Sequence, residues 1–118
     1  MLNFGKTRIH LATQHADFRK SIDGLSARVQ SVLEADPTSG HLFVFHNRRR
    51  SALKLLWWDR GAFNLLYRRL ERGRFKLPSF HAEARSVQLS QAELSAFIEG
   101  LRLLRLEPGE RWEPPTLD

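Results

Sequence analysis

The period of apolar and polar positions changes along the chain, and each change predicts a different element. Residues 7–13 alternate apolar Ile9 and Leu11 with polar neighbours, which predicts a short strand. Over residues 16–35, apolar side chains recur at spacings of three and four, which predicts an amphipathic helix near the N-terminus. Asp17 stands near the expected start of this helix, where a carboxylate complements free backbone N–H groups. Gly24 inside the pattern suggests a close packing contact.

The middle of the chain changes to the period of β-strands. Residues 42–45 are apolar and largely aromatic, whereas residues 52–58 and 62–70 alternate around two turn signals. Residues 59–61, Asp-Arg-Gly, predict a three-residue hairpin in which the glycine takes a positive φ. Residues 71–73, Glu-Arg-Gly, have the same form, so Phe75-Lys76-Leu77 is expected to begin a further strand. A helix over 62–71 is the alternative, because Phe63, Leu66 and Leu70 also fit a helical period.

The last part of the pattern predicts a strand at 84–89 followed by a helix. Ser90 and Glu93 have the spacing of a capping box, and Leu89 and Leu94 that of a hydrophobic staple. Gly100 is expected to end this helix. The fold class is therefore α+β, with an antiparallel β-meander of four to five strands packed by an N-terminal helix and a C-terminal helix. One domain over residues 1–106 and a Pro-rich, flexible tail over 107–118 complete this prediction.

Composition narrows the cellular setting. The 118 residues contain no cysteine, which removes disulfides, cysteine zinc sites and thiol nucleophiles. No apolar run approaches the roughly 18 residues of a membrane span, and the first residues lack the pattern of a secretory signal. These features favour a cytoplasmic protein without membrane contact.

The net charge of +6 is concentrated in one segment. Residues 46–78 hold ten Lys/Arg against Asp59 and Glu71, a balance of +8, whereas residues 1–45 carry +1 and residues 79–118 carry −3. A focused excess of this kind is typical of proteins that meet a polyanion, most often nucleic acid. The alternative is a solvated basic face with no partner.

The turns of the predicted meander gather these cations at one edge. Alternate turns of an antiparallel meander lie at the same end of the sheet, so the turn at 48–50 and the turn at 72–74 are expected about 10 Å apart. Arginine's planar guanidinium suits phosphate oxygens, although arginines at turn tips can also be simply solvated. The predicted nucleic-acid-binding residues are Arg48, Arg49, Arg50, Lys54, Arg68, Arg69, Arg72, Arg74 and Lys76.

Trp57 and Trp58 are adjacent in a predicted strand and must face opposite sides of it. Trp58 is a candidate for stacking on a base or packing on a partner, and the alternative is that helices cover both rings. No catalytic motif and no paired metal-ligand spacing of histidines is present. The sequence therefore predicts no enzyme activity, no metal site and no cofactor.

The central residues resemble a known family. Residues 36–45 (DPTSGHLFVF), 54–59 (KLLWWD), 69–75 (RLERGRF) and 17–25 (DFRKSIDGL) are similar to the TnpB accessory proteins of bacterial insertion sequences of the class numbered sixty-six. The resemblance covers about residues 7–104 in the same motif order, and departs from the family at residues 64–66 and in the tail. It implies a role in DNA transposition beside a separate transposase, without catalytic residues of its own.

Two functions remain open. The chain is either a DNA-binding accessory protein or an interaction module that recruits or positions the transposase without touching DNA. An exposed tryptophan or the edge of the meander would carry the second role. The oligomeric state is not predicted.

Overall fold

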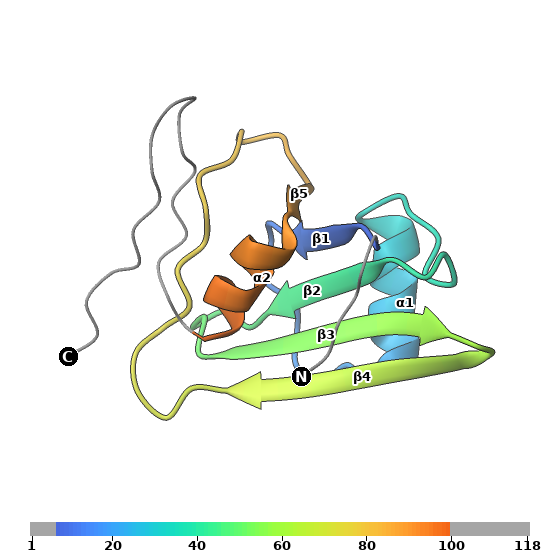
Figure 1. Cartoon of the computed structure of the whole chain (residues 1–118), viewed down its shortest axis with the longest axis horizontal. Coiled ribbons are helices and arrows are strands. Elements are labelled where there is room, and N and C mark those ends of the chain that lie inside the picture. The colour runs from blue at the N-terminus through green and yellow to red at the C-terminus, as the bar shows by residue number, and fades with distance from the viewer. Residues whose placement is uncertain (1–6, 100–118) are drawn as a thin grey trace.

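The computed structural model describes residues 7–99, which form one α+β domain of five strands and two helices (Figure 1). The strands are β1 (Ile9–Ala12), β2 (Leu42–His46), β3 (Ala52–Asp59), β4 (Ala62–Arg69) and β5 (Ser86–Leu89). The helices are α1 (Ile22–Ser31) and α2 (Gln91–Ile98). Within this described range, no helix has the length and apolar character needed to cross a membrane.

The strands form a single mixed sheet in the order β4-β3-β2-β1-β5. The run β2-β3-β4 is antiparallel, as predicted, but β1 lies parallel to β2, and β5 pairs antiparallel with β1 rather than with β4. The expectation of a purely antiparallel meander was therefore wrong. The physical reason is the segment between β1 and β2, which is long enough to hold α1 and so allows the crossover that parallel strands require.

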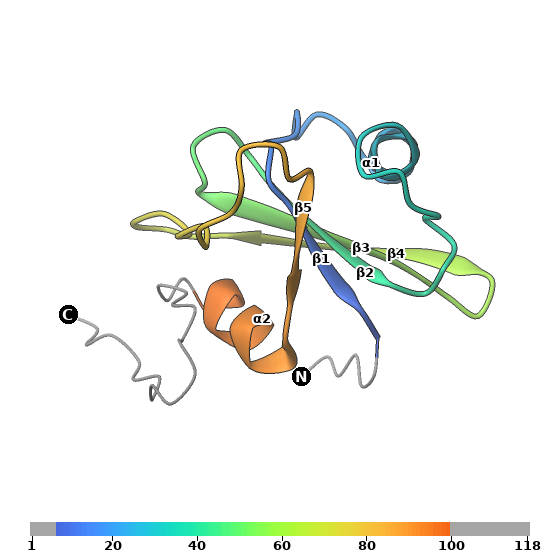
Figure 2. The same ribbon diagram turned by 90° about the horizontal axis from the view of Figure 1, so that it is seen from above.

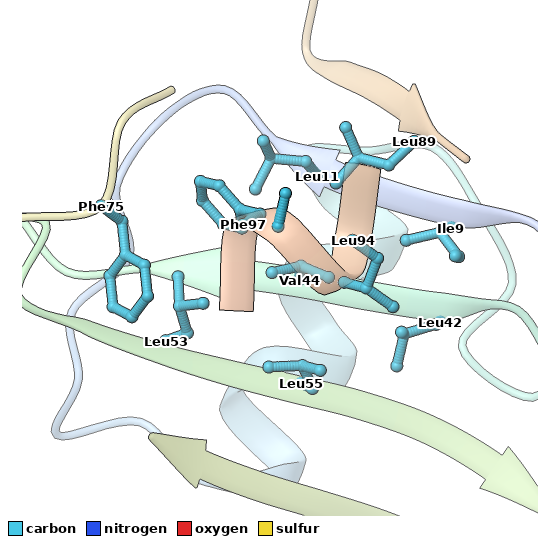
Figure 3. Packing of buried hydrophobic residues seen from close by; sticks show 11 residues of the cluster. Ile9, Leu11, Leu42, Val44, Leu53, Leu55, Phe75, Leu89, Leu94 and Phe97 are labelled. Atoms are coloured by element: carbon cyan, nitrogen blue, oxygen red, sulfur yellow. The ribbon is translucent and has the colours of Figure 1, made fainter. Parts of the chain in front are cut away.

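The two helices cover opposite faces of the sheet, so the domain has three layers (Figure 2). On the face of α2, a buried cluster includes Leu53, Leu55, Phe75 and Phe97 (Figure 3). On the face of α1, a second cluster is built from Leu25 and Val29 of the helix and from apolar side chains of the sheet. All five residues of β2 are buried, because this strand lies inside the sheet and is covered on both sides.

Helix α1 is shorter than predicted and is preceded by β1, so it is not the first element of the chain. It begins at Ile22 rather than near residue 16. Asp17 does not cap it, because its carboxylate accepts hydrogen bonds from the backbone and side chain of Arg19 instead. The close contact expected at Gly24 is present, since a Cβ added there would lie 2.9 Å from Cβ of Lys20.

Two local predictions are confirmed with a change of detail. Ser90 and Glu93 form both hydrogen bonds of a capping box at the start of α2. The turn between β3 and β4 has two residues rather than three, because Asp59 already pairs with Ala62. Both residues of the turn have positive φ, 51° at Arg60 and 83° at Gly61, as in a type I′ hairpin. The helical alternative for 62–71 is wrong.

The strand expected at 75–77 is absent, although this segment is well anchored. Phe75 is fully buried and its ring lies 5.5 Å from that of Phe97, so packing rather than strand pairing holds it. The backbone N–H of Phe75 donates to the carbonyl of Arg50. The expected end of α2 at Gly100 and the tail over 107–118 lie outside the described residues.

Candidate nucleic-acid interface

Two turns at one end of the sheet bring five arginines together. We call Arg48, Arg49, Arg50, Arg72 and Arg74 the arginine rim. The two turns are joined by a hydrogen bond of 2.8 Å from the backbone of Leu70 to Ser51 and one of 2.7 Å from Phe75 to Arg50. The sequence prediction that the turns are neighbours agrees with these bonds.

The first turn of the rim is held by Asn47. Its side-chain oxygen accepts hydrogen bonds from the backbone of Ser51 at 2.8 Å and of Ala52 at 3.1 Å, and its own carbonyl accepts one from Arg50. Arg50 has a φ of 57°, a left-handed conformation that is costly for a residue with a Cβ. Strained residues of this kind persist where the surroundings over-determine them, and they are concentrated at functional sites.

Four arginines of the rim are exposed and carry no ion pair within residues 7–99: Arg48, Arg49, Arg72 and Arg74. Lys76 is likewise exposed and lies two positions after the rim. Arg50 is half-buried. Four guanidinium groups exposed at turn tips, with Glu71 as the one carboxylate in these two turns, form a positive surface that suits phosphate oxygens.

Three other predicted contact residues have partners inside the protein. Lys54 lies on the α1 face, and its Nζ donates to the carbonyls of Phe18 at 3.0 Å and Lys20 at 2.7 Å. Arg68 lies on the α2 face and donates from Nε to the carbonyl of Ile98 at the end of α2, a position that favours a cation. Arg69 is 3.6 Å from the carboxylate of Glu71, an exposed pair that contributes little.

Trp58 does not join the arginine rim. It lies at the far end of β3, about 20 Å along the strand from the turn at 48–51. The two tryptophans face opposite sides, as predicted, with Trp57 against the cluster of α2 and Trp58 edge-on to Phe63 at 4.8 Å. Both are half-buried. A stacking role for Trp58 stays a prediction, and it would be separate from the phosphate contacts.

A groove beside the rim is the part of the surface that the sequence did not predict. It has a volume of about 900 Å³ and lies between residues 13–20 and residues 46–50, with Arg28 and Leu77 at its margin. We call it the basic groove. Its walls contain Arg19, Lys20, Arg28 and the first three arginines of the rim, against one carboxylate, Asp17. No pattern in residues 13–20 signals this role, because the segment reaches the rim only through tertiary contacts.

Hydrogen bonding and burial shift the pKa values of two groups in the groove, Asp17 and His46. Asp17 is held by Arg19 at 2.7 Å, and the hydrogen bonds from Arg19 lower the pKa of Asp17 to about 2, so it is ionised. His46 is almost fully buried at the base of the groove, 3.1 Å from the carbonyl of Ala12. Burial lowers the pKa of His46 from 6.5 and outweighs its backbone hydrogen bonds, which favour the charged ring.

No group of three or more His, Cys, Asp or Glu side chains that could hold a metal occurs among the described residues. His10 and His41 do come together, with ring nitrogens 3.0 Å apart and rings stacked, a pairing that sequence spacing could not show.

Comparisons with known proteins cover most of the chain. The profile of the family described as "IS66 Orf2 like protein" matches residues 7–108. The "Uncharacterized protein y4hO" of Sinorhizobium fredii is 41% identical over 107 residues, which span 91% of this chain and 90% of the relative. The "Uncharacterized protein y4jC" of the same organism is 38% identical over 100 residues, spanning 85% and 84%. None of the solved structures matches the chain.

Proposed function

The chain belongs to the IS66 Orf2-like family, which suggests an accessory protein associated with transposition. We propose that it binds DNA through the arginine rim while a separate transposase performs the chemistry. The single observation behind this proposal is the junction of the two arginine turns. Arg48, Arg49, Arg72 and Arg74 are exposed there without carboxylate partners in the described range.

The proposed contacts are made to phosphates rather than to bases. The rim is formed by turns at the end of the sheet, and neither α1 nor α2, which could have entered a major groove, contributes a residue to it. Guanidinium groups on a scaffold fixed by backbone hydrogen bonds can position the protein on the duplex without reading its sequence. Lys54 and Arg68 serve the fold in this proposal, since their donors already have carbonyl partners.

The salt dependence of binding tests the proposal. Neutralising about five phosphates predicts a log–log slope of about −4 to −5 on a short duplex, measured by fluorescence anisotropy from about 50 to 200 mM salt. The variant Arg72→Gln/Arg74→Gln should make this slope about 1.8 units shallower.

A matched control uses Arg8→Gln/Arg60→Gln. These two exposed arginines lie at the opposite end of the sheet, beside the start of β1 and in the turn between β3 and β4, and their removal changes the net charge equally. The control should keep the slope of the wild type. No binding, a slope near zero, or equal losses in both variants would refute contact through the rim.

A second candidate function is supported by the edge strand β4. The register of β3 and β4 and the bond from Leu70 to Ser51 direct the backbone groups of Phe63, Leu65 and Tyr67 away from β3. Within the described residues no backbone partner meets them. Residues 62–67 carry no charge, and such an edge can accept a strand from another protein. In this role the chain would position the transposase.

The edge function can be tested by a pull-down of the transposase of the same element from nuclease-treated lysate. Tyr67→Pro removes an outward N–H from β4, whereas Tyr67→Ala removes only the exposed ring, so capture should fall with the first and persist with the second. Equal capture by both variants would refute strand addition. Loss of all capture after nuclease treatment would favour bridging by DNA.

A further inference from the structure

The basic groove has a shape that the arginine rim lacks. The rim is a pair of turn tips, whereas the groove is a hollow of about 900 Å³ with walls from two segments far apart in the sequence. This volume is within the range of sites for small ligands, and it is too small to hold a DNA duplex. A polyanion that enters the groove must therefore be narrower than a duplex.

The groove combines cations with a less polar base. Its lining holds six Lys/Arg and one acid, a formal excess of five positive charges, and the acid is already paired with Arg19. Phe18 and Leu77, which are half-buried, provide apolar surface beside these cations. Cations that follow a backbone, next to apolar or ring side chains on which bases can rest, are typical of surfaces that bind single strands.

The wall formed by residues 13–20 is irregular but firmly held. The backbone of Ala16 donates to His46 at 2.9 Å, and Arg28 donates to the carbonyl of His15 at 2.9 Å. The ammonium of Lys54 holds two further carbonyls of the same wall. A groove whose walls are fixed before binding loses little conformational entropy when a ligand enters.

The groove is continuous with the proposed duplex surface, because Arg48, Arg49 and Arg50 belong to both. We infer that the basic groove binds a short single-stranded segment of DNA that continues from a duplex on the arginine rim. The protein would thus recognise a junction between paired and unpaired DNA, as at an opened or processed DNA end. This inference rests on the proposed DNA-binding function and names the form of DNA involved.

The test compares a blunt duplex with the same duplex carrying a four-nucleotide overhang, using fluorescence anisotropy at one salt concentration. The overhang should raise the affinity of the wild type about tenfold, through added phosphate contacts and base packing. In His15→Asn/Lys20→Gln, which changes two exposed positions of the groove wall, this advantage should fall below about twofold while affinity for the blunt duplex is retained.

The matched control is Arg60→Gln/His81→Asn, which removes the same formal charge at two exposed positions outside the groove and away from the arginine rim. It should keep the tenfold advantage of the overhang. Equal unfolding midpoints in urea would show that both variants are folded. If the groove variant His15→Asn/Lys20→Gln is unstable, Gln14→Glu offers a single substitution at an exposed position of the same groove wall.

The outcomes separate this inference from the proposed function. If neither DNA binds, the proposed function fails and the inference fails with it. If the blunt duplex binds with the expected salt slope but the overhang adds nothing, the groove inference alone is overturned. It is also overturned if the groove variant keeps the advantage, or if a polyglutamate peptide of equal charge displaces the overhang DNA as well as an oligonucleotide does.

Discussion

Lys54 tests whether a cation of the basic segment stabilises the fold or contacts DNA. Its ammonium donates to the carbonyls of Phe18 at 3.0 Å and Lys20 at 2.7 Å and lies 5.1 Å from the centre of the Phe18 ring. It thereby ties the irregular segment before α1 to the middle of β3. Lys54→Met keeps a long, flexible side chain and removes the donors, so we expect it to destabilise the fold rather than to weaken DNA binding.

The magnitude follows from these contacts. Hydrogen bonds that involve a charged group are worth about 1.5–3 kcal/mol each, so two give an upper bound of about 3–6 kcal/mol. The bond to Lys20 is exposed, and water can replace the lost donor there. The methionine also recovers apolar contact. We therefore expect the free energy of unfolding to fall by about 2 kcal/mol, including the lost cation–π contact of about 0.5 kcal/mol.

The assay is urea unfolding followed by the fluorescence of the β3 tryptophans, with Lys76→Met as the control. Lys76 is exposed and has no partner within the described residues, so its change should stay within about 0.5 kcal/mol. Equal midpoints for the two variants would refute the structural role of Lys54. So would a Lys54→Met protein of unchanged stability whose DNA-binding slope is shallower by about one unit, because that result would place the ammonium on a phosphate.

Three further predictions concern single elements of the fold. Ser90→Ala should lower the free energy of unfolding by about 1 kcal/mol, because it removes the capping box of α2. The control Ser95→Ala, at an exposed position of the same helix, should leave it unchanged. Equal urea midpoints for the two variants would contradict the role of the cap. Replacing a helix glycine by alanine usually raises the free energy of unfolding by about 1 kcal/mol. Gly24→Ala should not, because the Cβ of the alanine would lie 2.9 Å from Cβ of Lys20. A higher melting temperature of this variant would contradict the close contact. Burial lowers the pKa of His46 from 6.5, so the unfolded chain binds a proton first as the pH falls. The free energy of unfolding should therefore fall as the pH drops below about 6.5. His46→Gln should show a smaller loss of this free energy between pH 7.5 and 5.5, and an equal loss would contradict the buried position of His46.

Local patterns predicted most of the elements. The alternation over 52–58 and 62–70, the capping box at Ser90 and the glycine of the β3–β4 turn each depend on neighbouring residues, and each is present in the structure. The parallel pairing of β1 and β2 was not predicted, because the same strands are compatible with either direction. Only the crossover through α1, which begins six residues later than expected, decides it.

In the candidate site, too, features that depend on adjacent elements were predicted, and features that depend on tertiary contacts were not. Meander geometry predicted that the two arginine turns are neighbours, since that depends only on the order of adjacent strands. It did not predict that Lys54 and Arg68 are engaged by backbone carbonyls 36 and 30 positions away. The groove wall at residues 13–20 was missed for the same reason, because a buried histidine and a lysine from distant strands hold it in place.

The position of β1 inside the sheet has a consequence for the time course of folding. Its residue Ile9 pairs with Leu89, whereas the whole β2-β3-β4 run is contained between residues 42 and 69. Closing the longer loop costs more chain entropy, and contacts that are distant in sequence form slowly. We expect the three-stranded run to form first and the pairing of β1 with β5 to form last. A nascent chain still lacking residues 86–89 would therefore hold an incomplete sheet, and amide protection during refolding should reach β3 before β5.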